Sequence, residues 1–196
     1  MEQRIPPQEM NSEQFLSWLQ QQEQKFELVD AHPVLMAGAT QDHNDIVNAG
    51  LAELTLQLRG KPCRPIGSDS AVQIPAGNIR YPDFGVDCGE RNGKSMRTTA
   101  VAAVVEVLSP STQFLDFNRK LDDYKSVPTL KTILLVEQNA PRVHVYHREQ
   151  NTHWTATTVE GLSATVNMPE LGLSLALAIL YERIQFAFRP TLIEPA

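Results

Sequence analysis

A single carboxylate interrupts the most apolar stretch of this sequence. Glu106 lies between Val101–Val105 and Val107-Leu108, in a run rich in valine that predicts a buried strand. An ionised carboxylate that is buried without a partner is strongly unfavourable. The sequence therefore predicts a metal ion, another cation or a hydrogen-bond network beside Glu106, and the alternative is a structural ion pair or a strand end that reaches solvent.

A second carboxylate follows a proline in the segment Tyr81-Pro82-Asp83. Proline is confined to the edge, the start or a bulge of a strand, and such an irregularity can redirect the next side chain. If Asp83 lies on a strand next to Glu106, the two carboxylates could hold Mg2+ and leave positions for water and a phosphate. Taken alone, Asp83 could equally be a carboxylate of a turn or strand edge.

A candidate cation follows in the next predicted helix. Lys120 could hold a scissile phosphate or lower the pKa of an attacking water molecule. The alternative is an ordinary solvated lysine on the helix surface. Lys120 is therefore a candidate catalytic residue only if its ammonium lies near Glu106.

Other basic residues gather before and after the Glu106 strand, although the formal net charge is −6. This acidic total argues against a protein that coats nucleic acid nonspecifically, so any DNA contact must be local. Phosphate contacts by lysine and arginine give affinity that falls with salt. The candidates are Arg91, Lys94, Arg97, Arg119 and Lys125, and the alternative for the first three is an ordinary solvated loop.

The elements that would position these residues follow from apolar periodicity. Helices are predicted at 12–24, 41–59, 114–126 and 171–188. Strands are predicted at 26–30, 33–37, 68–74, 80–87, 100–108, 132–136, 142–147 and 154–159, with hairpins formed by the first two, the next two and the last two. The pattern is of the mixed α+β or α/β class, and we expect one domain over 1–196 with its core at about 12–188.

The two cysteines and the start of the chain bear on its compartment. Cys63 and Cys88 form no C-x-x-C pair and have no matching histidine cluster, so we expect free thiols rather than a zinc site or a disulfide. The segment MEQRIPPQEM has no apolar run, and no stretch approaches roughly 18 uninterrupted apolar residues. We therefore expect a cytoplasmic protein with no membrane partner.

The ordered set of motifs resembles the Uma-type putative restriction endonucleases of the PD-(D/E)XK superfamily. The resemblance covers about Glu23 to Tyr181, and its most specific block is Glu106-Val-Leu-Ser-Pro-Ser-Thr112. Further matches are Phe26-Glu27-Leu-Val-Asp30, His43, Arg80-Tyr-Pro-Asp83, Asp116 and Lys120. The resemblance implies a restriction-endonuclease-like core, with a mixed central sheet flanked by helices, and a DNA endonuclease that uses Mg2+ or Mn2+.

The same resemblance assigns roles to residues. Asp83 and Glu106 match the two acids of the motif and would bind metal, but Leu108 stands where the superfamily has lysine, so we propose Lys120 as its substitute, braced by Asp116. Glu27 would be an additional metal ligand or would support a metal ligand. His43 would orient water or phosphate, and the alternative is that it only caps the N-terminus of its helix. Ser109 and Ser111 would cap the following helix and lie near enough in sequence to touch a phosphate.

Two other functions fit the same residues. One is a catalytically inactive binding or oligomerisation module that keeps the nuclease fold, and the other is a hydrolase of RNA or another phosphodiester. A homodimer is expected, because C2 dimers are the commonest soluble assemblies and many relatives of this fold cut two strands as dimers. The recognition sequence and biological role do not follow from these residues.

Overall fold

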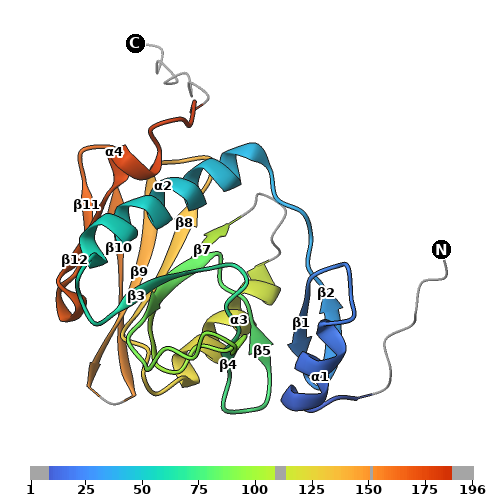
Figure 1. Ribbon diagram of the computed structural model, residues 1–196. Coiled ribbons are helices and arrows are strands. Elements are labelled where there is room, and N and C mark those ends of the chain that lie inside the picture. The colour runs from blue at the N-terminus through green and yellow to red at the C-terminus, as the bar shows by residue number, and fades with distance from the viewer. Residues whose placement is uncertain (1–8, 109–113, 151, 187–196) are drawn as a thin grey trace, which may run out of the picture.

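A six-stranded mixed sheet forms the centre of the molecule (Figure 1). The computed structural model describes residues 9–108, 114–150 and 152–186, without the side chains of 114–117 and 150. The strand order is β10-β9-β8-β7-β6-β3. These strands are β3 (Arg64–Gly67), β6 (Phe84–Asp87), β7 (Val101–Leu108), β8 (Thr132–Glu137), β9 (Arg142–Gln150) and β10 (His153–Glu160).

The middle of this sheet is the strand–helix–strand unit expected from the sequence. Helix α3 (Phe114–Ser126) connects β7 to β8, which pair in parallel, whereas the other neighbouring strands pair antiparallel. Apart from Leu108 at its end, every residue of β7 is buried, Glu106 included. The predicted mixed sheet with a buried central strand is therefore confirmed.

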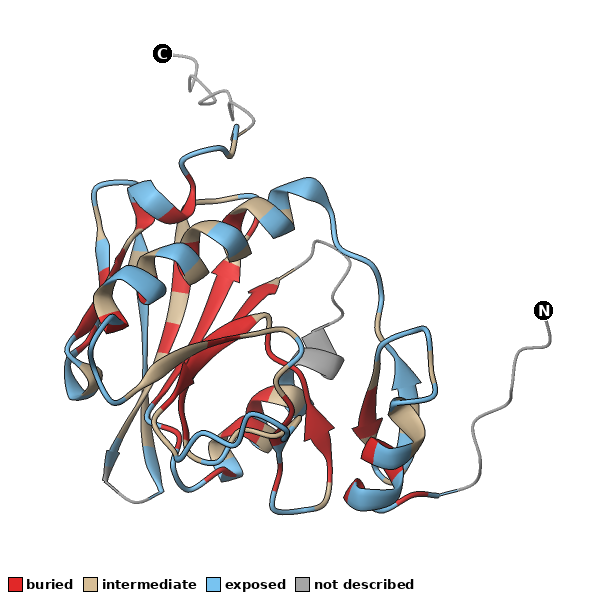
Figure 2. Ribbon diagram, in the orientation of Figure 1, coloured by how far each residue is buried: buried red, intermediate tan, exposed pale blue. Residues whose placement is uncertain are grey.

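Two layers cover the two faces of the sheet (Figure 2). Helix α2 (Gln41–Leu58), helix α4 (Leu177–Leu180) and the hairpin of β11 (Thr165–Met168) and β12 (Leu173–Ala176) pack on one face. On the opposite face, α3 packs Leu121 and Tyr124 against Val104 and Ile133. Within the described part of the chain, no helix has the length and apolarity needed to cross a bilayer.

A second sheet lies beside the first and is built largely from the N-terminal part of the chain. Its order is β2-β1-β5-β4, with β1 (Phe26–Val29), β2 (His32–Leu35), β4 (Val72–Gln73) and β5 (Ile79–Arg80), and α1 (Ser12–Leu19) packs against it. The β1–β2 turn contains Asp30 and Ala31, both with positive φ. The segment expected as one strand at 80–87 is split, because Pro82 and Asp83 lie between β5 in this sheet and β6 in the central sheet.

The C-terminal helix expected at 171–188 is wrong for the described residues. A short 3-10 helix, η1 (Pro169–Leu171), precedes strand β12, and only Leu177–Leu180 is helical. Leu173 and Leu175 are buried while the residues between and after them are partly exposed, which is the two-residue period of a strand. Its partner β11, like β3, was not expected, and helix 12–24 is shorter than expected, ending at Leu19.

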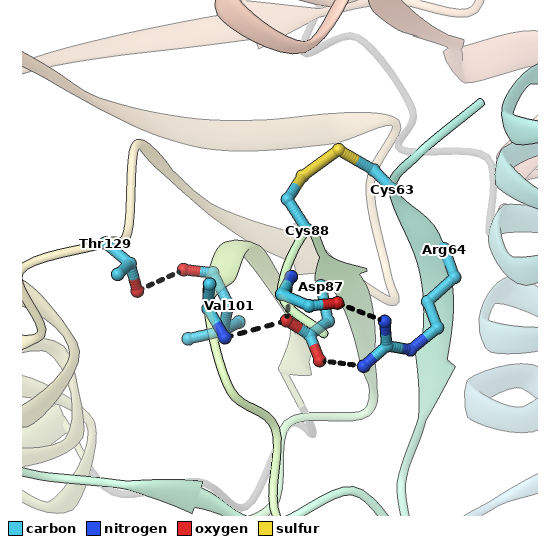
Figure 3. Close-up of a disulfide and its surroundings, with 8 residues drawn as sticks. Cys63, Arg64, Asp87, Cys88, Val101 and Thr129 are labelled. Carbon is cyan, nitrogen blue, oxygen red and sulfur yellow. Dashed lines mark hydrogen bonds and ion pairs between the residues drawn. A yellow bond between two sulfur atoms is a disulfide. The ribbon is translucent and has the colours of Figure 1, made fainter. Parts of the chain in front are cut away.

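The expectation of free cysteines is also wrong. Cys63 and Cys88 form a disulfide, drawn in Figure 3. The antiparallel register of β3 and β6 pairs Arg64 with Asp87. Cys63 precedes Arg64 and Cys88 follows Asp87, so the same register places the two cysteines opposite each other. Arg64 also donates to Asp87 at 2.5 Å, so a covalent bond and an ion pair join the same two strands.

We expect the disulfide to stabilise the sheet edge, since it closes a loop between residues 25 apart in sequence. The double variant Cys63→Ser/Cys88→Ser should lower the free energy of unfolding by roughly 3 kcal/mol in urea titrations under oxidising conditions. Reductant should destabilise the wild type and leave the variant unchanged. Equal stability of the two proteins without reductant would contradict the prediction.

The close approach of α2 to β6 depends on Gly50. A Cβ atom there would overlap the ring of the fully buried Phe84 and lie 3.2 Å from Leu180 Cδ2. Gly50→Ala should therefore lower the free energy of unfolding by about 1–3 kcal/mol, which outweighs the helix propensity of alanine. Gly38→Ala is the control, because nothing lies within 4 Å of its Cβ position, and equal stability of both variants in urea would refute the packing argument.

Candidate active site

Four separate segments bring ionisable side chains to one place. Glu106 comes from β7, Lys120 from α3 and Glu27 from β1, while Asp83 lies between the two sheets. Each of these four side chains has less than a fifth of its surface exposed. The cluster therefore forms where the second sheet meets the central one.

Lys120 lies between two carboxylates. Its Nζ is 3.0 Å from Glu106 Oε1 and 3.0 Å from Glu27 Oε1. Burial alone would lower the pKa of Lys120, but the charges of Glu106 and Glu27 outweigh it and hold this pKa above its ordinary value. Lys120 is thus a fixed positive charge beside Glu106 at neutral pH.

Glu106 is held at one of its two oxygens. Tyr124, one helical turn after Lys120, donates its hydroxyl to Glu106 Oε1 at 2.6 Å. Within the described residues no hydrogen bond or ion pair reaches Oε2, so that oxygen is free to accept a further ligand. Burial, opposed by Lys120 and reinforced by the charges of Asp83 and Glu27, raises the pKa of Glu106 to about 7.

Asp83 is fixed beside Glu106 through the backbone of β7. Its Oδ2 accepts a hydrogen bond from the Val107 amide at 2.7 Å, and its Oδ1 lies 3.0 Å from His43 Nε2. Val107 follows Glu106 directly, so the two carboxylates are close neighbours, in keeping with the raising effect of Asp83 on the pKa of Glu106. Pro82 suits this position because it ends the pairing of β5 before the chain enters β6.

His43 contributes to both the helix start and the site. The side chain that caps α2 belongs to Thr40, whose hydroxyl accepts from the His43 amide at 3.2 Å. The imidazole of His43 points instead to Asp83. Its side chain therefore contacts a candidate metal ligand.

Glu27 is engaged at both oxygens. Besides Lys120, Oε1 accepts from the Tyr81 amide at 3.0 Å, and Oε2 accepts from Arg80 Nη1 at 2.9 Å. Burial would raise the pKa of Glu27, but Lys120 and Arg80 hold it below its ordinary value. Because two cations already compensate its charge, Glu27 fits an anchor for Lys120 better than a metal ligand, whereas Asp83 has no lysine or arginine partner within the described residues.

Sequence reasoning gave no site role to Tyr124, Arg80 or Asp123, although Arg80 stands in the matched segment Arg80-Tyr-Pro-Asp83. Arg80 is almost fully buried and joins Glu27 to Asp123, whose Oδ2 it contacts at 2.7 Å. The four-residue spacing of Lys120 and Tyr124 on one helix face could have indicated Tyr124. The strand pattern around Arg80 gave no comparable indication.

The other predicted residues are not gathered here. Arg119 pairs with Asp30, Arg97 pairs with Glu13 and Gln73, and Lys125 lies over the Tyr146 ring. Arg91 and Lys94 are exposed in their loop. Ser109 and Ser111 lie outside the described residues, as does the side chain of Asp116.

The residues present fit a divalent cation held by two carboxylates. No group of three or more histidine, cysteine, aspartate or glutamate side chains is arranged around a common metal position in the described residues. Mg2+, however, commonly uses one or two carboxylates and completes its shell with water and substrate phosphate. Asp83 and the free Oε2 of Glu106 supply such a pair.

The comparisons with known proteins agree with this fold. A model of the Uma2 family, described as putative restriction endonuclease, matches residues 12–179. The chain belongs to the Uma2 family. Two uncharacterized proteins of Synechocystis sp. are similar: slr1290 is 31% identical over 90% of this chain and 94% of its own, and sll1609 is 28% identical over 76% and 88%.

A solved structure supports the fold assignment of this Uma2-family chain. The crystal structure of a putative nuclease belonging to DUF820 from Anabaena variabilis superposes with a TM-score of 0.71 at 17% identity. The match covers 88% of this chain and 98% of that one. The expected restriction-endonuclease-like fold is therefore confirmed.

The raised pKa of Glu106 predicts a stability cost that depends on pH. The native state binds a proton at Glu106 more readily than the unfolded chain, so stability falls as pH rises from the ordinary value of 4.5 to about 7. Glu106→Gln removes this cost, and in EDTA its free energy of unfolding should exceed the wild type by roughly 1–3 kcal/mol at pH 8 and by less at pH 5.

Urea titrations at the two pH values measure this difference. Glu170→Gln, which changes an exposed carboxylate, controls for the loss of one negative charge. A gain for Glu106→Gln that is the same at pH 5 and pH 8 would show that Glu106 stays ionised throughout.

Proposed function

We propose that this Uma2-family chain is a Mg2+-dependent DNA endonuclease whose site is formed by Asp83, Glu106 and Lys120. The observation that carries the proposal is the approach of the Lys120 ammonium to Glu106 at 3.0 Å beside Asp83. Two carboxylates can hold a metal ion for phosphodiester hydrolysis, and a cation beside them can stabilise the developing negative charge. The description of the family supports DNA as the substrate.

Each residue has a definite task in this proposal. Asp83 and Glu106 would hold Mg2+ or Mn2+, which when bound supplies Lewis acidity toward the phosphodiester and the attacking water. Lys120, held by Glu27, would stabilise the negative charge that develops on the phosphate. His43 would keep Asp83 in place, and Tyr124, which binds Oε1 of Glu106, would leave Oε2 available to the metal ion.

Double-strand cleavage would require two such sites. We therefore include a homodimer in the proposal, since a C2 pair presents two identical sites to the two antiparallel strands. Size-exclusion chromatography with light scattering, with and without a duplex, measures this directly. A monomer under both conditions would restrict the activity to nicking.

Cleavage of supercoiled and linear DNA with Mg2+ or Mn2+ tests the site. Asp83→Asn, Glu106→Gln and Lys120→Met should each lower the cleavage rate by at least roughly a hundredfold, because the first two weaken metal binding and the third removes the positive charge beside the reacting phosphate. Lys61→Met, which removes an exposed lysine, should retain wild-type activity. Circular dichroism would confirm that each variant is folded.

Three outcomes would contradict the proposal in whole or in part. Retained cleavage in the folded Asp83→Asn or Glu106→Gln variant would place the site elsewhere. No cleavage of DNA by the wild type, together with no heat of Mg2+ or Mn2+ binding by calorimetry, would favour the inactive binding module. Cleavage of RNA but not DNA would keep the site and change the substrate.

A further inference from the structure

A second concentration of positive charge lies away from the carboxylates, on the face of the sheet that α3 covers. A pocket of about 620 Å3 opens between the C-terminal end of α3 and the β9–β10 hairpin. Lys125 and Ser126 line it from α3, Lys131 from the loop before β8, and Arg148 and Trp154 from β9 and β10. Figure 1 shows α3 running toward the β9–β10 end of the central sheet.

The lining of this pocket is cationic and contains no carboxylate, although the whole chain carries a formal charge of −6. Lys125 and Lys131 take part in no ion pair within the described residues. By contrast, Arg97 and Arg119 are each paired with an acid. The pocket therefore presents lysine charge that the described acids leave uncompensated.

Aromatic rings hold the cations in place. Arg148 lies 4.5 Å from the centroid of Trp154, and Lys125 Nζ lies 4.9 Å from that of Tyr146. Arg148 also donates to the carbonyls of Lys125 and Val127 at 2.8 and 2.7 Å. Arg148 thus joins the C-terminal end of α3 to the β9–β10 hairpin, and Lys125 and Lys131 lie beside this contact.

We infer that this pocket binds backbone phosphates of the DNA strand on one side of the scissile position. Lysine and arginine beside a partly exposed aromatic ring, here Trp154, form a pattern that contacts a nucleic-acid backbone. Lys125 follows Lys120 by five residues, which corresponds to about 7.5 Å along the helix axis. With 3.6 residues per turn, Lys125 also points about 140° away from Lys120 around the helix. Helix α3 would therefore carry one lysine at the reacting phosphate and another toward a phosphate farther along the strand.

This inference rests on the proposed function, and its test separates the two. Fluorescence anisotropy of a labelled 24-base-pair duplex in EDTA measures affinity without cleavage. The Lys125→Gln/Lys131→Gln variant should bind about tenfold more weakly at moderate salt, and the slope of log K against log[salt] should fall in magnitude by about two. Arg59→Gln/Lys61→Gln is the control, because it removes the same charge from exposed positions at the end of α2.

The outcomes are distinct. Equal affinity and salt slope for the pocket variant and the control would overturn the pocket while leaving the nuclease proposal untouched. Weakened duplex binding would support the pocket even if no DNA is cut. Displacement of the duplex by inorganic phosphate at matched ionic strength would overturn the inference and assign the pocket to small anions.

Discussion

The position of the Lys120 ammonium between Glu27 and Glu106 is the interaction on which the site depends. It joins β1 of the second sheet, α3 and β7 of the central sheet through two contacts of 3.0 Å. Glu27, Glu106 and Asp83 would otherwise repel one another in a poorly solvated space. Removing the ammonium of Lys120 would leave the buried Glu106 without a cation and Glu27 with Arg80 alone. The cost of such an uncompensated buried charge exceeds the stabilisation that an exposed ion pair gives.

The same interaction limits the chemistry that Lys120 can perform. Because Glu106 and Glu27 outweigh the effect of burial and raise its pKa, Lys120 keeps its proton near neutral pH. A lysine in this state cannot accept a proton from water, so its contribution must be electrostatic. Arg80 compensates buried charge in the same way on the other side of Glu27, because it contacts both Glu27 and Asp123.

The elements that could be predicted from the sequence are those whose pattern of apolar residues lies within one segment. The continuous valine-rich run around Glu106 predicted β7, and the helical spacing of Leu121 and Tyr124 predicted α3, because each signal lies within one short segment. The edge strand β3, the β11–β12 hairpin and the Cys63–Cys88 bond depend on pairing between distant segments. Glu106 was identifiable because a charge breaks an apolar run. The role of Arg80 as a partner of Glu27 could be assigned only from the pairing of β5 with β1.

The structure also gives a physical account of the leucine found two residues after Glu106. Along β7, Val104, Glu106 and Leu108 share the face that α3 covers, and Leu108 packs against the apolar cluster there. A lysine at 108 and a lysine projecting from α3 would approach the same face of the same strand. The position of an ammonium in space, rather than its place in the chain, determines which phosphate it can stabilise, so α3 can supply the charge while Leu108 completes the core.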